Sequence, residues 1–167
     1  MSLAALLGTA VWCDIRTGRI PNRLLAVGLV AGLLLSGLPQ GMGWGSASLG
    51  LLAGLAAFMP FYGLRVLGAG DVKLLAIVGL FVGYPGIWMV ALFSAMAGGV
   101  MALALAAYGG RLHSTLSETH QTLQYLVMQT RNGLPPSAAS GVAGSTQLPY
   151  ALAIAIGTLA YAGWAAI

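Results

Sequence analysis

Charged side chains are scarce in this sequence, which has three acidic and seven basic residues among 167, or 6% of the chain. A soluble domain carries about 25% charged residues. Hydrophobic residues make up 59% of the chain, and its mean hydropathy is +0.90. So few charges cannot cover a water-facing surface, and we therefore expect the lipid bilayer to be the main solvent. The length predicts one membrane domain over residues 1–167.

Cysteine is almost absent too, since Cys13 is the single one in the chain. This excludes an internal disulfide, and there is no Cys-x-x-Cys pair to bind zinc. The basic residues are scattered singly rather than clustered, which argues against a nucleic-acid partner. The first residues also lack the basic segment of a secretory signal peptide.

Long apolar runs are what the sequence has instead. A helix needs roughly 20 apolar residues to cross a hydrocarbon core of about 30 Å. The sequence predicts an all-α, polytopic membrane protein with six transmembrane helices, because six such runs alternate with polar or glycine-rich breaks. The runs are residues 2–13, 24–38, 47–64, 72–82, 87–108 and 148–167.

Basic residues fall in or beside the first, third and fifth breaks between these runs, while the second and fourth breaks carry no charge. They are Arg16, Arg19, Arg23, Arg65, Lys73, Arg111 and Arg131. Basic loops favour the cytoplasmic side, so the odd breaks are expected inside and both chain ends outside.

The fifth break, residues 109–147, carries its own helix signal. Thr115 and Glu118 form a capping-box pattern, which predicts a cytoplasmic interfacial helix over about 116–131 with its leucines toward the membrane. The whole segment either gates access to a site or connects two helices, and connection is the favoured interpretation.

Paired glycines occur four residues apart in two of the predicted spans, as Gly28/Gly32 and Gly50/Gly54. This spacing allows two helix backbones to approach closely. The alternative, equally open from the sequence, is that these are ordinary membrane glycines with no special contact.

Two acidic residues stand at the ends of predicted spans. Asp14 follows the first span and Asp71 precedes the fourth, so the topology places both near the cytoplasmic surface. These spans are short, rising only about 16–18 Å as helices, so we expect helix to continue through each aspartate or the membrane to thin. The structural alternative is a pair of loop residues neutralised by Arg16 and Lys73.

Two carboxyl groups within hydrogen-bonding range cannot both ionise, so such a pair shares a proton. The ionised member can activate a water molecule, and the protonated member can donate to a peptide carbonyl. Such a pair needs no metal, cofactor or covalent intermediate. A helix N-terminus favours negative charge and a C-terminus disfavours it, so Asp71 is our hypothesis for the base and Asp14 for the proton donor, although Arg16 and Arg19 oppose this assignment.

The segment before Asp71 has almost no side chains. Gly68, Ala69 and Gly70 leave the backbone bare beside the acid. Glycine permits unusual backbone angles and close approach of another chain. We expect this bare segment to hold an extended substrate by strand addition.

Together the motifs D-I-R-T-G-R-I-P-N (residues 14–22) and G-A-G-D-V-K (residues 68–73) resemble the type IV prepilin peptidases, which are GxGD intramembrane aspartyl proteases. The short form and L-P-Y-A-L-A-I-A-I-G (residues 148–157) resemble the small CpaA/TadV-like branch, which serves Flp/Tad pili.

The resemblance implies that Asp14 and Asp71 are the catalytic pair of an aspartic endopeptidase. It implies removal of a short basic leader from type IV or Flp-type prepilins at the cytoplasmic face of a prokaryotic inner membrane. The larger bifunctional members also methylate the new N-terminus and carry paired cysteines, which are missing here, so methyl transfer is not expected.

Other motif residues are expected to shape the site. Pro21 should start the second helix, Asn22 should bond near the turn after Asp14, and Lys73 should lie close to Asp71. Pro149 and Tyr150 should open the last helix toward the site.

Two rival functions use the same residues. One is a proton- or ion-coupled transport component, which would normally bind its ion near the bilayer midplane between internal repeats, and no repeat is visible. The other is a non-enzymatic scaffold for pilus or secretion assembly.

Overall fold

The computed structural model describes residues 3–38, 43–63, 67–108 and 150–166. Over these ranges the chain is all-helical with no strand, as predicted. The helices are α1 (Leu3–Thr17), α2 (Asn22–Ser36), α3 (Trp44–Gly63), α4 (Ala69–Val82), α5 (Gly86–Tyr108) and α7 (Tyr150–Ala165).

Each predicted span overlaps one of these helices, but six membrane crossings are not established. Only α3 and the stretch Gly86–Leu105 of α5 are long and apolar enough among the described residues to cross a membrane. Helices α1 and α4 extend past the predicted spans and include Asp14 and Asp71, as the short-span argument expected. The predicted interfacial helix at 116–131 lies outside the described residues.

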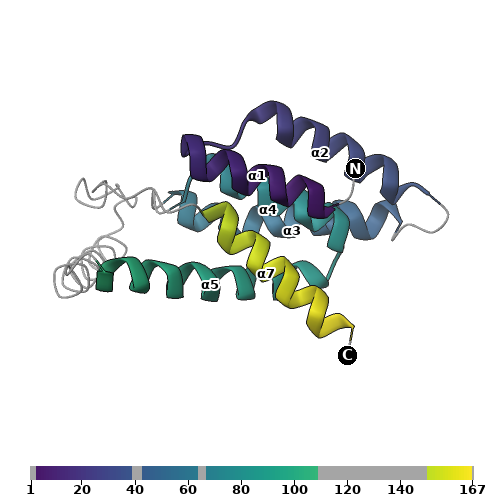
Figure 1. The fold of residues 1–167 in the computed structure, drawn as a ribbon. Coiled ribbons are helices and arrows are strands. Elements are labelled where there is room, and N and C mark those ends of the chain that lie inside the picture. Colours follow the sequence, from purple (N-terminus) through teal and green to yellow (C-terminus); the bar gives the residue numbers. More distant parts are fainter. Residues whose placement is uncertain (1–2, 39–42, 64–66, 109–149, 167) are drawn as a thin grey trace, which may run out of the picture.

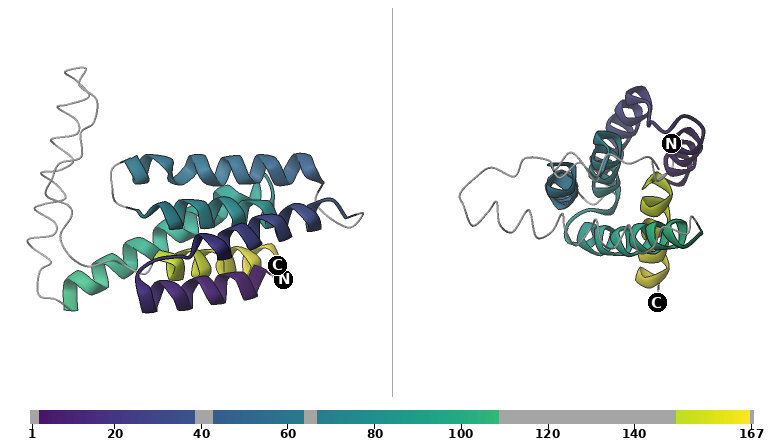
Figure 2. Two further views of the ribbon diagram at one scale, coloured as in Figure 1. Left: turned by 90° about the horizontal axis from the view of Figure 1, so that it is seen from above. Right: turned by 90° about the vertical axis from the view of Figure 1, so that its left-hand side faces the viewer.

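The described helices run back and forth, so that consecutive helices point in opposite directions (Figure 1). The first residues of α1 and the last residues of α7 lie at the same end of the bundle, in both Figure 1 and the view from above in Figure 2. The ends of α1, α3 and α5 and the starts of α2, α4 and α7 therefore lie at the opposite end. Which side of a membrane each end faces remains a prediction.

Helix α4 forms the centre of the bundle, where it packs against α2, α3, α5 and α7. Eight of its residues are buried, mostly leucine, isoleucine and valine. Burial all around a helix is the expected result of apolar side chains on every face. Asp71 therefore lies at one end of the most enclosed helix in the structure.

The glycine pairs lie at helix contacts, which settles the question that the sequence left open. A Cβ atom on Gly50 would collide with the backbone oxygen of Gly79, and one on Gly54 would lie 2.8 Å from the backbone oxygen of Leu75. In α2, Gly28 and Gly32 similarly face side chains of α1 and α4. The pairs thus let α2 and α3 approach their neighbours closely, as the spacing predicted.

Candidate active site

Asp14 lies in the last turn of α1 and is 9% exposed. Its Oδ2 atom accepts a hydrogen bond from the backbone N–H of Ala151 at 3.1 Å. Ala151 belongs to the first turn of α7, so this bond joins the end of α1 to the start of α7. Just beyond, Gly18 has a φ of 62° and its N–H donates to the backbone oxygen of Asp14 at 2.8 Å, which ends α1.

Asp71 is the third residue of α4 and caps its own helix. Its Oδ2 atom accepts the backbone N–H of Gly68 at 3.2 Å, and Gly68 is the extended N-cap residue. This bond is the Asp71 half of a capping box, because Gly68 has no side chain to complete it, and the N–H of Asp71 donates instead to the backbone oxygen of Gly68 at 3.1 Å. The carboxyl group of Asp71 is thereby fixed at the positive end of α4.

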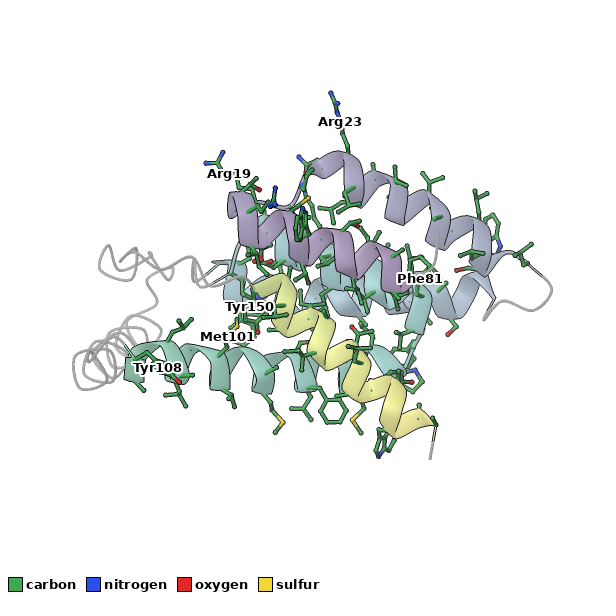
Figure 3. All side chains as sticks on the ribbon, viewed as in Figure 1. Arg19, Arg23, Phe81, Met101, Tyr108 and Tyr150 are labelled. Carbon is green, nitrogen blue, oxygen red and sulfur yellow. The ribbon has the colours of Figure 1, made fainter. Side chains whose placement is uncertain are left out.

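The two carboxyl groups lie close enough for the charge of Asp14 to act on Asp71, and the charge of Asp71 in turn acts on the Tyr150 hydroxyl. Three helices therefore converge, since these residues come from α1, α4 and α7. Figure 3 shows Tyr150 at the start of α7, with Arg19 and Arg23 at the same end of the bundle. The structure thus brings together the two acids that the sequence singled out.

Neither expected neutralising partner pairs with its aspartate. The Arg16 guanidinium lies over the Trp12 ring, 4.3 Å from its centroid. The Lys73 ammonium donates to the Asn22 side-chain oxygen at 3.4 Å. The alternative of two loop acids neutralised by adjacent basic residues therefore loses its support, and both aspartates stand in helices instead.

Of the two residues expected at the start of α2, Asn22 has a different partner from the one predicted, while Pro21 is placed as predicted. Asn22 was expected to bond near the turn after Asp14, but its side chain bonds Lys73 and so links the start of α2 to α4. Pro21 does mark the start of α2, as the N-cap residue whose carbonyl accepts from the N–H of Leu24 at 3.0 Å.

The expectation of a bare, extended segment before Asp71 is wrong for its last two residues. Ala69 and Gly70 are helical, so they do not present the extended backbone that strand addition needs. Gly70 instead leaves room for the connector between α1 and α2, because a Cβ atom there would lie 3.3 Å from Ile20. The glycines of this motif serve helix capping and packing.

Tyr150, at the start of α7, packs closely against residues of α3 and α5. Its ring packs edge-on against Phe58 of α3, with centroids 5.7 Å apart, and against Gly98 of α5. Its hydroxyl donates weakly to the backbone oxygen of Ser94 at 3.5 Å. Pro149 lies outside the described residues.

The sequence argument for which aspartate is the base does not survive this geometry. It relied on Asp14 lying at a helix C-terminus and Asp71 at an N-terminus. In the structure each carboxyl group accepts an N–H from a helix N-terminus, Asp14 from α7 and Asp71 from α4. The two sites are therefore more alike than the sequence indicates, and a coupled pair is best described as titrating together.

A comparison with family models decides what kind of protein carries these two aspartates. Residues 1–103 match the model of the type IV leader peptidase family, and this match includes both Asp14 and Asp71. The chain belongs to the type IV leader peptidase family. No curated protein and no solved structure matches it.

Membership in the type IV leader peptidase family supports a leader-peptidase-like protease of the aspartic type, and it implies prepilin-like substrates. Proteins of this family are membrane proteins, in agreement with the two long apolar helices α3 and α5. The match ends before α7, so the helix that contacts Asp14 lies beyond the matched residues.

Sequence reasoning missed Ala151 because this residue contributes a backbone group. Any residue except proline has the same N–H, so no side-chain pattern could reveal the contact. The motif L-P-Y at residues 148–150 was the only nearby signal. Gly98 was missed for a similar reason, since a lone glycine in an apolar helix carries no pattern.

Proposed function

We propose that the protein is an intramembrane aspartic endopeptidase that removes the basic leader peptide from prepilins of the type IV or Flp class, at the cytoplasmic membrane face. The observation that carries this proposal is the convergence of two carboxyl groups from α1 and α4 at one end of the bundle, where the charge of one acts on the other. The proposed catalytic pair is Asp14 and Asp71.

The proposed chemistry uses the pair in two protonation states. One carboxylate takes a proton from a water molecule, which attacks the scissile carbonyl carbon. The other carboxyl group donates its proton to the carbonyl oxygen, which gives a tetrahedral diol. As the C–N bond breaks, the first carboxyl group passes the proton taken from water to the leaving pilin amine. The second carboxylate takes a proton back from the diol, which becomes the leader's new carboxyl terminus. Two neighbouring carboxyls that share one proton can supply both steps at the same pH.

The basic side chains near the site support the cytoplasmic assignment. Arg19 and Arg23 lie at the same end of the bundle as Tyr150 (Figure 3), and Lys73 reaches Asn22 at that end as well. Basic residues of short loops favour the cytoplasmic side. We therefore place the site at the inner face of a prokaryotic cytoplasmic membrane, with both termini outside and lipids around the helices.

Further expectations concern the neighbouring residues. Gly68, Ala69 and Gly70 shape the turn that carries Asp71. Pro21, Asn22 and Lys73 line the same end of the bundle, and Pro149 with Tyr150 leads α7 toward the pair. We place the protein with the small branch that serves Flp/Tad pili.

The direct test is leader removal from a membrane-embedded prepilin by the purified, reconstituted protein. Asp14→Asn and Asp71→Asn each keep the shape of the side chain while removing its charge and proton. We expect each to lower the cleavage rate by at least roughly a thousandfold, since neither half of an acid–base pair works alone. Thermal unfolding of the same samples checks that the variants fold.

Cleavage at the wild-type rate by either variant would falsify the proposed pair. The transport alternative makes a different prediction, because ion flux across vesicles would then occur without any peptide and would be lost in the same variants. A scaffold would show neither cleavage nor flux in the wild-type protein.

A further inference from the structure

Helix α7 is distant from both aspartate motifs in the sequence, yet its first turn lies against them. The bond from Ala151 N–H to Asp14 Oδ2 is 3.1 Å long, and both residues are buried. Hydrogen bonds to a carboxylate are stronger than those between neutral groups, and burial removes competing water. This contact therefore restricts the orientation of the Asp14 side chain.

Two glycines fix where α7 lies relative to α5. A Cβ atom on Gly157 would lie 2.5 Å from the backbone nitrogen of Ser94, and one on Gly98 would lie 2.5 Å from the Tyr150 ring. A side chain at either position would collide with the facing helix, so the close approach of α7 to α5 depends on both glycines. The N-terminus of α7 is thereby held where Ala151 reaches Asp14.

Electrostatics give the contact a further consequence. Asp14 lies near the C-terminal end of α1, where the helix dipole opposes negative charge. The N-terminus of α7 supplies the opposite contribution at the same carboxyl group. Among the described residues, the other titratable groups toward the site are Asp71 from α4 and Tyr150 from α7, while Arg16 on α1 stacks on Trp12.

We propose that α7 is a positioning element of the peptidase site: the Ala151 amide orients the Asp14 carboxyl toward Asp71 and stabilises its ionised form, and α5 sets the register that allows this. The proposal rests on the proposed peptidase function. It assigns a role at the site to a helix outside the residues that match the family model. Ala151 acts through Asp14 and is a positioning residue.

The test removes one N–H while keeping the helix. Proline is tolerated in the first turn of a helix because the N–H groups there have no intrahelical partner. Ala151→Pro deletes the donor to Asp14, and Leu152→Pro places the same residue one position later as the matched control. Both are made in the full chain, reconstituted with a membrane-embedded prepilin.

We expect Ala151→Pro to move one limb of the pH–rate profile of the coupled pair upward by about one pH unit, since a lost hydrogen bond to a carboxylate favours its protonated form. We expect kcat to fall about tenfold with KM little changed. Leu152→Pro should keep the wild-type profile. A uniform loss of rate in both variants with no shift in the profile would overturn the proposal.

A second readout does not depend on cleavage. The chain has only two aspartates, so isotope-labelled aspartate in an Asp71→Asn background reports Asp14 alone by infrared spectroscopy. The Asp14 carboxyl band and its titration midpoint should shift in Ala151→Pro and stay in Leu152→Pro. If the wild-type protein cleaves prepilin but this band is unchanged, α7 has no such role. If the band shifts and the wild-type protein does not cleave, the positioning contact holds and the peptidase function fails.

A second pair of variants guards against misfolding by proline. Gly98→Ala and Gly99→Ala add the same methyl group to adjacent positions of α5, but only Gly98 faces Tyr150, while the space around Gly99 is open. Gly98→Ala should displace the start of α7 and shift the Asp14 band in the same direction, and Gly99→Ala should not. A folded Gly98→Ala protein with the wild-type band and profile would contradict the proposal.

Discussion

The two aspartates of the site are supported in different ways. Asp71 is held by its own helix, through the bond from Gly68 three residues earlier, and its helix α4 is enclosed by four others. Asp14 is held by Ala151, 137 residues away in the sequence. One carboxyl group is therefore positioned by local sequence and the other by the tertiary fold.

This difference explains which part of the site could be read from the sequence. A capping box has a fixed spacing, so Gly68 and Asp71 are visible as a motif. A backbone contact between α1 and α7 has no spacing and no residue preference. The consequence is testable, because damage to α4 packing should affect the whole fold, whereas damage to α7 should affect Asp14 first.

The largest effect is expected at the contact between α3 and α4. Gly50→Ala places a methyl group against the backbone oxygen of Gly79, which cannot move as a side chain would. We expect the free energy of unfolding to fall by about 1–3 kcal/mol. Thermal unfolding in detergent or lipid should show a lowered midpoint, and peptidase activity should fall in proportion to the folded fraction.

Gly45 provides the control for this variant, because the space around its Cβ position is open and it lies on the same helix. Gly45→Ala should be neutral or slightly stabilising, since alanine is the better helix former. Equal destabilisation by the two substitutions would show that the close approach of α3 to α4 does not depend on Gly50.

Helix positions were largely predictable from the sequence, and the reason is physical. Apolar runs must be buried in lipid or protein, so they mark the positions of the helices, and each of the six predicted runs overlaps one. Helix ends were less predictable, because α1 continues beyond Asp14 to Thr17 and α4 begins before Asp71 at Ala69. Polar residues at a helix end satisfy caps and contacts that hydropathy does not register.

The two aspartates of the site could be predicted from the sequence, but the contacts of the residues around them could not. Asp14 and Asp71 stand out because acidic residues are so rare in this chain. The predicted hydrogen-bond partner of Asn22 was wrong, because whether its side chain bonds Lys73 or the turn after Asp14 depends on how α2 packs against α4. The prediction of an extended backbone before Asp71 was wrong for Ala69 and Gly70, because the sequence does not distinguish glycines at a helix start from glycines in an extended loop.

A smaller effect is expected at Tyr150, whose hydroxyl group can be removed without disturbing the packing of its ring. This substitution tests how much α7 contributes to the site. Tyr150→Phe keeps the ring between Phe58 and Gly98 and removes only the hydroxyl. Because that hydroxyl interacts with Asp71 and bonds Ser94 at the long distance of 3.5 Å, we expect at most about a tenfold loss of kcat. Steady-state cleavage kinetics would measure it.

Tyr161→Phe is the matched control, since it removes a hydroxyl from the other tyrosine of the same helix. It should leave the rate of leader removal unchanged. If Tyr150→Phe reduces cleavage more than a hundredfold while Tyr161→Phe does not, the hydroxyl takes part in the chemistry itself, and α7 contributes more than positioning.

The smallest effect is expected at Lys73, which lies within two residues of Asp71 and was a predicted neighbour of its carboxyl group. Its side chain is exposed and bonds Asn22 at 3.4 Å, a long distance for a hydrogen bond. Lys73→Gln should therefore change the free energy of unfolding by no more than about 0.5 kcal/mol and leave the pH–rate profile in place. A clear shift of the profile would instead mean that the ammonium turns toward the Asp71 carboxyl group in the working enzyme. The support of Asp71 would still be local, because Lys73 belongs to α4 as Asp71 does, and the bond from Lys73 to Asn22 of α2 would then be given up.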